Sequence, residues 1–338
     1  MRYRSLFHFS LLGVLAFSLL GCQQQSVQER YIFLEQEQKV VEQVHDEDNM
    51  AKYGVFSDIH GETKRLKVFA KTMQERGVEG FLVLGDTPEN DVLRSGGRQQ
   101  EKRNDIEEMI EAFTLLGKTD LPVFVLPGNH ERKPTYETAI KEVTAKYHNI
   151  IDLAQYRSVD GDDVDFISLP GYQIKEMVSK DVYSGKENKR KFIPDDGYSA
   201  DAETITATGK LGRNLDDAVI LLTHGPPKTT SSSADTTHIS PFLGPGTLYD
   251  GSDVGDEATR KMMLDNNLHF ALSGHIHEAG GLAATLDGKR VPVGQWAESF
   301  ILNVGSLEDW KLLDGSVSRG MTAIVTVDGK KAKYETLH

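Results

Sequence analysis

The sequence predicts a layered α/β domain, and three observations support this prediction. Apolar, strand-like runs alternate with amphipathic, helix-like segments from residue 51 onward. Several β-like runs follow one another near the end of the chain, which indicates a second sheet packed on the first. The 338 residues, 38% of them hydrophobic, are enough for one large α/β domain.

Three strand–helix pairs open this domain. The strands are predicted at 53–58, 80–86 and 122–130, and the helices that follow them at 62–76, 100–117 and 134–147. Further strands are predicted at 164–171, 218–227 and 268–277, with a helix at 258–267, and "FILNVGS" (300–306) and "MTAIVTV" (321–327) complete the series. Short apolar strands separated by helices favour parallel pairing in a buried sheet.

Two polar stretches interrupt this alternation. Residues 172–216 and 228–257 are long for connections within a compact domain, and loops of such length are usually functional or disordered. Because both flank strands that end in candidate ligands, we expect them to form the walls of a substrate cleft. Tyr172 is expected either to line this cleft or to pack against its neighbours.

The N-terminus carries the pattern of an export signal. Arg2 and Arg4 precede an apolar run, Leu6 to Leu20, that is too short and too interrupted for a transmembrane helix. The run ends in "LLGC", which resembles a bacterial lipobox, and Cys22 is the single cysteine of the chain. We therefore predict a lipoprotein signal at residues 1–22 and lipidation of Cys22. The protein is then expected in the cell envelope, outside the cytoplasmic membrane, in the periplasm or at the cell surface. Ordinary export with an incidental cysteine is the alternative.

Residues 23–50 are rich in Gln and Glu and contain no glycine. This composition predicts a polar tether with some helical character, which would lift a domain of residues 51–338 off the membrane. The formal net charge of −13 and the lack of a basic face in the sequence argue against duplex nucleic acid as the main partner.

Five of the predicted strands end in residues whose side chains can bind a metal ion. Parallel sheets collect the carboxyl ends of their strands at one edge, and flanking glycines allow close backbone approach there. Oxygen and nitrogen donors without sulfur suit Mn, Fe, Zn, Ni or Co. In chain order, the strand ends carry Asp58 and His60, then Asp86, then Asn129 with His130 and Glu131, then His224, and last His275 with His277.

Each of these residues also has a plain structural interpretation. Asp58 and Asp86 can cap helices, and Asn129 can serve a turn. His130 can be structural, and Glu131 is expected to support a neighbouring residue or to face solvent. The occurrence of five such strand ends in one chain favours the metal site over these interpretations.

In this order the motifs resemble those of the calcineurin-like metallophosphoesterases. The resemblance covers roughly residues 51–310 and rests on Asp58-x-His60, Gly85-Asp86, Gly128-Asn129-His130-Glu131, His224 and Gly274-His275-x-His277. It implies an αββα sandwich of two mixed β-sheets flanked by helices, and two divalent or trivalent transition metal ions. By this resemblance one ion is held by Asp58, His60, Asp86 and His277, and the other by Asp86, Asn129, His224 and His275. His130 is implied as general acid or phosphate contact.

The sequence departs from the protein Ser/Thr phosphatases of this superfamily. They carry an Asp-Arg-Gly triplet after the aspartate that corresponds to Asp86, and this triplet is missing here. They also lack the paired histidines of "GHIH" (274–277). "THGPP" (223–227) together with "SGHIHEAGG" (273–281) is more similar to the branch that holds bacterial class III cyclic-nucleotide phosphodiesterases. "NVGS" (303–306) also recurs in the family.

The resemblance implies a dinuclear-metal phosphohydrolase that cleaves phosphodiester or nucleotide-type substrates by a metal-activated hydroxide. A phosphomonoesterase or nucleotidase with the same metal site is the first alternative, since only the cleft loops would separate the two. A non-catalytic, envelope-anchored binding protein is the second. The partners that these predictions imply are a small phosphorylated substrate and, through the lipid anchor, a membrane.

Overall fold

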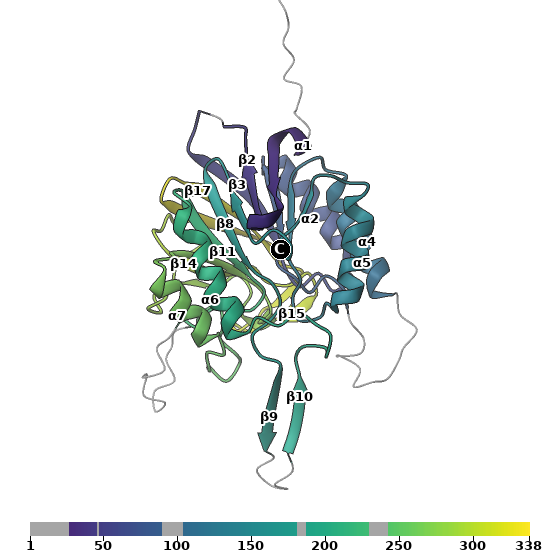
Figure 1. Cartoon of the computed structure of the whole chain (residues 1–338). Helices are drawn as coiled ribbons and strands as arrows, with labels where there is room; N and C mark the ends of the chain where they lie inside the picture. Colours follow the sequence, from purple (N-terminus) through teal and green to yellow (C-terminus); the bar gives the residue numbers. More distant parts are fainter. Residues whose placement is uncertain (1–26, 46, 90–103, 181–186, 230–242) are drawn as a thin grey trace, which may run out of the picture.

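The computed structural model describes residues 27–45, 47–89, 104–180, 187–229 and 243–338. Two mixed β-sheets lie face to face and carry helices on their outer faces (Figure 1). Within the described ranges, no helix combines the length and apolarity needed to cross a bilayer. The predicted export signal and Cys22 lie outside these ranges.

The larger sheet has eight strands, and β8, β11, β12 and β14 form its parallel centre. β7 runs antiparallel to β8, and β13 runs antiparallel to β14, so the sheet is mixed. The strands in sheet order are β1 (Tyr31–Leu34), β2 (Lys39–Glu42), β7 (Ser158–Asp160), β8 (Val164–Leu169), β11 (Ala218–Thr223), β12 (Phe270–Ser273), β14 (Phe300–Asn303) and β13 (Ala283–Ala284).

The second sheet has six strands, and β3, β4, β5 and β6 are parallel. β17 runs antiparallel to β3 and pairs with β18 at the sheet edge. The strands in sheet order are β18 (Lys331–Leu337), β17 (Thr322–Asp328), β3 (Met50–Phe56), β4 (Gly80–Val83), β5 (Val123–Val125) and β6 (Ile150–Asp152).

Three apolar clusters hold these layers together. The first lies between the two sheets, where the rings of Tyr53 on β3 and Phe166 on β8 meet edge to face at 5.0 Å. The second packs α2 (Thr63–Glu75), α4 (Asp105–Gly117) and α5 (Lys133–Thr144) on the outer face of the six-stranded sheet. The third packs α6 (Ala202–Leu211) and α7 (Glu257–Asp265) on the outer face of the larger sheet. The αββα prediction is therefore confirmed.

The predicted polar tether is wrong for much of its length. A short helix, α1 (Val27–Arg30), leads into β1, which pairs antiparallel with β2. Because β2 pairs in parallel with β7, this segment forms one edge of the larger sheet. Tyr31 is 3% exposed and Val40 is fully buried in the cluster between the sheets, and Phe33 packs against that cluster. Glu and Gln dominate the composition around these apolar residues, so composition alone concealed the two strands.

The stretch 172–216 is not one long loop. It contains the hairpin of β9 (Glu176–Lys180) and β10 (Glu187–Lys191), which projects from the body of the molecule (Figure 1), and then α6. Asp201 caps α6 by accepting a hydrogen bond from the backbone N–H of Thr204. A second hairpin, β15 (Asp309–Lys311) and β16 (Val317–Arg319), lies outside both large sheets, as do the short 3-10 turns η1 (Glu35–Glu37), η2 (Gly212–Asn214) and η3 (His277–Ala279).

Candidate metal centre

The predicted donor residues follow strands of both sheets at one edge of the sandwich. β3, β4 and β12 end two or three residues before the donors that were predicted to belong to them. Asp58, His60, Asp86 and His275 have positive φ angles of 50°, 46°, 53° and 64°. This left-handed backbone is uncommon for residues other than glycine, and it clusters at functional sites. The strands are shorter than predicted because the backbone turns at the donors themselves.

Glycines let these turns approach one another. A Cβ atom on Gly128 would lie 2.3 Å from Oδ1 of Asp86, and one on Gly274 would lie 2.1 Å from Oδ2 of Asp58. Gly85 combines a φ of 92° with a position where a Cβ would meet the backbone of Gly128 at 2.3 Å. The glycines that flank the donors therefore serve the close backbone approach that the sequence predicted.

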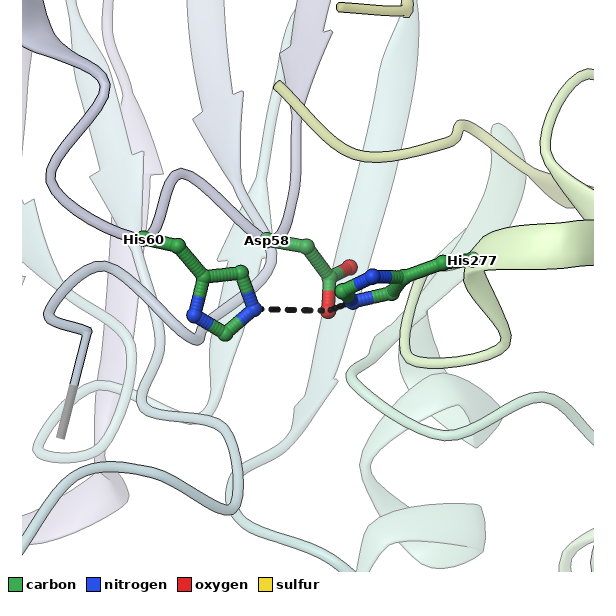
Figure 2. Close-up of side chains that lie close together, drawn as sticks. All are labelled: Asp58, His60 and His277. Carbon is green, nitrogen blue, oxygen red and sulfur yellow. Dashed lines mark hydrogen bonds and ion pairs between the residues drawn. The ribbon is translucent and has the colours of Figure 1, made fainter. Parts of the chain in front are cut away.

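Asp58, His60 and His277 form the first donor cluster (Figure 2). Oδ1 of Asp58 lies 3.0 Å from Nε2 of His277 and 3.8 Å from Nε2 of His60. Oδ2 of Asp58 accepts a hydrogen bond of 2.8 Å from the backbone N–H of His275, which orients the carboxylate. Both ring nitrogens of the buried His60 lack a hydrogen-bond partner among the described residues. A buried polar atom without a partner is costly, and a bound cation would satisfy it.

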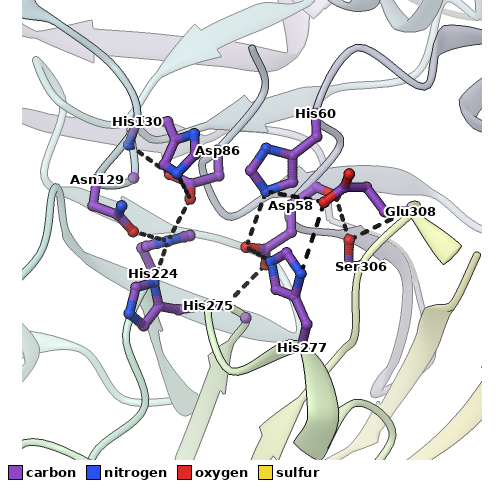
Figure 3. A network of polar contacts seen from close by, with 12 residues as sticks. Asp58, His60, Asp86, Asn129, His130, His224, His275, His277, Ser306 and Glu308 are labelled. Carbon is purple, nitrogen blue, oxygen red and sulfur yellow. Dashed lines mark hydrogen bonds and ion pairs between the residues drawn. The ribbon is translucent and has the colours of Figure 1, made fainter. Parts of the chain in front are cut away.

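Asp86, His224 and His275 form the second donor cluster, with Asn129 beside them (Figure 3). Nε2 of His224 lies 3.2 Å from Oδ2 of Asp86 and 2.8 Å from Oδ1 of Asn129. Nδ1 of His275 lies 3.2 Å from the same Nε2 atom. Nδ1 of His224 lies 2.9 Å from the carbonyl of Leu84, which assigns the proton to Nδ1 and leaves Nε2 facing the other donors.

His130 lies where the two clusters meet. Donor atoms of His60, Asp86 and His130 lie within 4.8 Å of one another, so Asp86 belongs to this group as well as to the second cluster. Oδ1 of Asp86 accepts a hydrogen bond of 2.8 Å from the backbone N–H of His130. Nδ1 of His130 lies 3.0 Å from the carbonyl of Glu89, and its Nε2 lies 3.7 Å from Oδ2 of Asp86. Nε2 of His130 is thus the atom that this side chain turns toward the centre.

The charges of the centre favour a cation. Burial opposes ionisation of both carboxyl groups, but nearby imidazoles outweigh it and hold the pKa values of Asp58 and Asp86 well below their usual range. Burial likewise opposes protonation of His224, yet the carboxylates of Asp86 and Asp58 raise its pKa to about 10. Burial lowers the pKa of His130 to about 4 and outweighs the attraction of Asp86. The two ionised, buried carboxylates therefore attract positive charge. Protonated imidazoles such as that of His224 supply it in the metal-free protein, and a bound metal ion would displace the proton from Nε2 and take its place.

Glu131 supports the backbone of the centre. Its fully buried carboxylate accepts hydrogen bonds from the backbone N–H groups of Asp86 at 3.1 Å, Thr87 at 2.8 Å and Gly128 at 2.8 Å. Burial and the neighbouring Asp86 raise the pKa of Glu131 to about 7, although these N–H groups oppose that rise. Glu131 thus joins the turns that carry Asp86 and Asn129, which agrees with the supporting role that we expected rather than with exposure to solvent.

The chain beyond β14 forms one side of the centre. The side-chain amide of Asn303 donates to the carbonyls of Gly274 and Ile276, and Oγ of Ser306 donates to the carbonyl of Asp58 at 3.0 Å. Oε2 of Glu308 lies 3.9 Å from Nε2 of His60 and 3.8 Å from Nδ1 of His277. The sequence motif "NVGS" pointed to this segment, but nothing in the sequence separated Glu308 from the charged residues of an ordinary turn.

Two aromatic side chains cover the second cluster. The ring of Tyr172 lies 4.0 Å from that of His275, and the ring of Phe192 lies 6.2 Å from Tyr172. The carbonyl of Phe192 accepts a hydrogen bond of 2.9 Å from the amide of Asn129, which directs Oδ1 of Asn129 toward His224. Tyr172 is 5% exposed, so it packs on the centre rather than offering a free surface.

The geometry fits a metal ion in each cluster. Two ligands at about 2.1 Å from one ion lie about 3–4 Å apart. In the first cluster Asp58 lies 3.0 Å from His277 and 3.8 Å from His60, and in the second His224 lies 3.2 Å from Asp86 and from His275. The donors are oxygen and nitrogen atoms only, as borderline transition metals prefer. The structure brings together the seven predicted metal ligands and His130, and their individual roles remain predictions.

Comparison with known families bears on the same residues. The Metallophos family, described as calcineurin-like phosphoesterase, matches residues 51–279, which is more than half of the chain. The chain belongs to this family. It is therefore a phosphoric ester hydrolase, and the family and the Asp/His clusters together indicate bound metal ions. β1, β2 and the chain beyond residue 279, Glu308 included, lie outside the matched range.

The chain is also similar to solved structures of low sequence identity. A dimetal phosphatase from Danio rerio is 12% identical with a TM-score of 0.50, over 85% of this chain and 98% of its own. The protein TT1561 of Thermus thermophilus is 11% identical with a TM-score of 0.49, over 82% and 94%. A third structure is 16% identical with a TM-score of 0.51, over 86% and 100%. At such identities the likeness concerns the fold. No curated protein sequence matches the chain.

Proposed function

We propose that this phosphoesterase hydrolyses small phosphodiesters, nucleotide-type diesters among them, at a centre that holds two divalent ions. The observation that carries the proposal is the connection between the two donor clusters: donor atoms of Asp86 lie within reach of His224 and His275 on one side and of His60 and His130 on the other. A single carboxylate between two donor clusters suits a pair of ions about 3.5–4 Å apart.

The donor atoms that face each cluster support the ligand assignment that the family resemblance implies. Asp58, His60 and His277 would hold one ion, and Asn129, His224 and His275 would hold the other, with Asp86 shared between them. Manganese, iron, zinc, nickel and cobalt all accept this set of donors. The dimetal phosphatase of Danio rerio supports two ions on this fold.

Residues around the two ions would have different roles in the reaction. Two divalent ions, when bound, lower the pKa of a coordinated water and neutralise charge on the phosphate oxygens. His130 faces the space between the clusters through Nε2, because the Glu89 carbonyl occupies its Nδ1 side. We assign to His130 the delivery of a proton to the departing alkoxide, or a hydrogen bond to the phosphate. Either role needs a second proton on Nε2, because Nδ1–H donates to the carbonyl of Glu89 and burial lowers the pKa of His130 to about 4. The negative charge of a bound phosphate would raise this pKa and favour the doubly protonated ring. Glu131 holds the backbone turns of Asp86 and Asn129 in place through its hydrogen bonds to the N–H groups of Asp86 and Gly128.

A comparison of a diester with a monoester tests this function. The protein from Val27 to the C-terminus, stripped of metal and reloaded with Mn²⁺, is assayed on bis-p-nitrophenyl phosphate and p-nitrophenyl phosphate. We expect faster diester hydrolysis that is lost in His277→Ala and kept in His269→Ala, since His269 is exposed and outside the clusters.

Two other outcomes would replace the proposal. Preference for the monoester would favour a phosphomonoesterase or nucleotidase on the same metal site. Turnover of neither ester by protein that retains both Mn²⁺ ions would favour an envelope-anchored binding protein.

We also propose that the chain is a lipoprotein anchored through Cys22. Only residues 23–26 separate Cys22 from α1, which limits the reach of the anchor to about 20 Å. α1 lies at the end of the molecule opposite β15, which borders the metal centre (Figure 1). The metal centre of an anchored molecule would therefore lie on the side away from the membrane. Membrane association of the full chain that Cys22→Ser abolishes would support the anchor, and equal release of both proteins would refute it.

A further inference from the structure

His277 presents its two ring nitrogens to different neighbours. Nε2 lies 3.0 Å from Oδ1 of Asp58, inside the first donor cluster. Nδ1, on the other side of the ring, is buried and lacks a hydrogen-bond partner among the described residues. The carboxylate of Glu308 faces this atom, with Oε2 at 3.8 Å.

The segment that carries Glu308 is fixed to the centre by its backbone. Ser306 donates through Oγ to the carbonyl of Asp58 and accepts from the backbone N–H of Glu308 at 3.1 Å. The backbone N–H of Leu307 also donates to the carbonyl of Asp58, at 3.1 Å. The Glu308 backbone is thus tied to that of Asp58 by hydrogen bonds. The 3.8 Å between Oε2 of Glu308 and Nδ1 of His277 exceeds an ordinary hydrogen bond by less than 1 Å.

Trp310 limits how the imidazole of His277 can rotate. Its ring lies 4.5 Å from that of His277, at an interplanar angle of 77°. The imidazole is therefore held between the indole of Trp310 and the carboxylate of Asp58, and Glu308 stands at its Nδ1 side.

We propose that Glu308 is a positioning residue for the metal centre: it accepts the Nδ1–H of His277 and so fixes Nε2 as the atom that binds the ion. Metal-ligating histidines commonly donate their second ring N–H to a carboxylate or carbonyl, which sets the tautomer and raises ligand basicity. Glu308 lies beyond the range matched by the family, so this role belongs to the chain's own C-terminal segment. The inference rests on the proposed metal centre.

Titration with Mn²⁺ alone tests the inference without any substrate. The metal-free wild-type chain from Val27 is compared with Glu308→Ala, Glu308→Gln and the neighbouring control Asp309→Asn, whose side chain is exposed and pairs with Arg65. Isothermal titration gives the affinity of each site. We expect Glu308→Ala to weaken one of the two sites by about 10- to 100-fold, because the loss of such a partner typically has that effect.

The glutamine variant separates a positioning role from direct ligation. Its amide oxygen can still accept the Nδ1–H of His277, so Glu308→Gln should retain most of the affinity that Glu308→Ala loses. Asp309→Asn should bind both ions as wild type does. Equal, large losses in Glu308→Gln and Glu308→Ala would overturn the inference in favour of a ligand or a purely electrostatic role.

The tautomer of His277 gives a second readout. In ¹H–¹⁵N spectra of Zn²⁺-loaded wild type, the His277 signal, assigned by its absence in His277→Ala, should show a protonated Nδ1. Glu308→Ala should lose the protection of this proton from exchange, whereas Glu308→Gln should keep it. Wild-type affinity in Glu308→Ala would overturn this inference alone, and failure of the wild type to bind Mn²⁺ would overturn the proposed function with it.

Discussion

At the scale of single residues, Gly274 shows how tightly the two sheets meet at the centre. A Cβ at this position would lie 2.0 Å from Oγ of Ser57 and 2.1 Å from Oδ2 of Asp58. Gly274→Ala must therefore displace the carboxylate of Asp58 from His277. We expect the Mn²⁺ affinity to fall by about tenfold or more, and the free energy of unfolding to fall by about 1–3 kcal/mol.

Gly212 offers a matched control, because it ends α6 at an ordinary φ of −74° and a Cβ there would find its nearest atoms at 3.4 Å. Isothermal titration of both variants, with urea unfolding of the metal-free proteins, checks the prediction. Gly212→Ala should bind Mn²⁺ as wild type does. If Gly274→Ala does the same, the close approach of the two strand ends is not needed to form the centre.

The residues that gather in the two clusters were predictable because each one follows an apolar strand and lies near a glycine. Asp86 after Gly85, and His275 after Gly274, are examples in which the backbone requirement and the chemical requirement occupy neighbouring positions. Glu308 was not predictable, since it acts through its place beside His277, a residue 31 positions earlier in the chain. A contact of this kind is created by the fold and leaves no local pattern.

At the scale of secondary structure, strands with continuous apolar runs were predicted from the sequence. Strands with few buried apolar residues were missed. β2 has only Val40 and Glu42 buried, and the charged residues around it concealed the pairing with β7. α6 was missed for a related reason, because its Gly209 disfavours a helix locally. A Cβ on Gly209 would lie 2.4 Å from Asn266, so close packing of α6 near the end of α7 requires that glycine.

β1 and β2 should contribute to the stability of the domain. Tyr31 packs edge to face against Phe124 at 6.0 Å, inside the cluster between the sheets. A chain that begins at residue 51 loses this burial and leaves β7 as an unpaired edge, so its free energy of unfolding should be lower by roughly 3–6 kcal/mol than that of a chain from Val27. Urea unfolding monitored by circular dichroism measures the difference.

Two substitutions within β1 make this prediction specific. Tyr31 is 3% exposed and the adjacent Ile32 is 40% exposed. Tyr31→Ala should cost about 3–5 kcal/mol and Ile32→Ala about 1 kcal/mol or less. Equal effects of the two substitutions, or equal stability of the two chains, would contradict this prediction. Residues 27–50 would then add no stability to the domain, as expected of a tether.

At the scale of the whole molecule, alternation of strands and helices predicted one layered domain, but the order of strands came only with the structure. The prediction of two facing sheets came from the resemblance to the metallophosphoesterases. Sequence periodicity could not give it, because it does not tell which strand lies beside which. Neither source placed β1 and β2 next to β7, or β17 antiparallel to β3, since such neighbours depend on pairing between distant segments.

Asp165 makes the stability of the whole molecule depend on pH. It is fully buried on β8, where burial raises the pKa of its carboxyl to about 7, although the backbone N–H groups of Asp217 and Gly161 oppose the rise. Between about pH 4 and 7 the folded protein keeps a proton that the unfolded chain has released. Stability therefore falls as pH rises through this window, by roughly 2–4 kcal/mol, and does not recover above it.

Comparison with Asp165→Asn isolates this contribution, because the other titrating groups cancel in the difference between the two proteins. The free energy of unfolding of Asp165→Asn, relative to wild type, should rise by roughly 2–4 kcal/mol between about pH 4.5 and pH 8. Asp216, close by but exposed, is the matched control for the loss of a nearby charge, and Asp216→Asn should change this difference by much less than Asp165→Asn does. Urea unfolding at several pH values across this range measures both differences. Parallel curves for Asp165→Asn would show that Asp165 ionises in the folded protein as readily as in the unfolded chain, and that the buried carboxylate is stabilised by its two N–H donors after all.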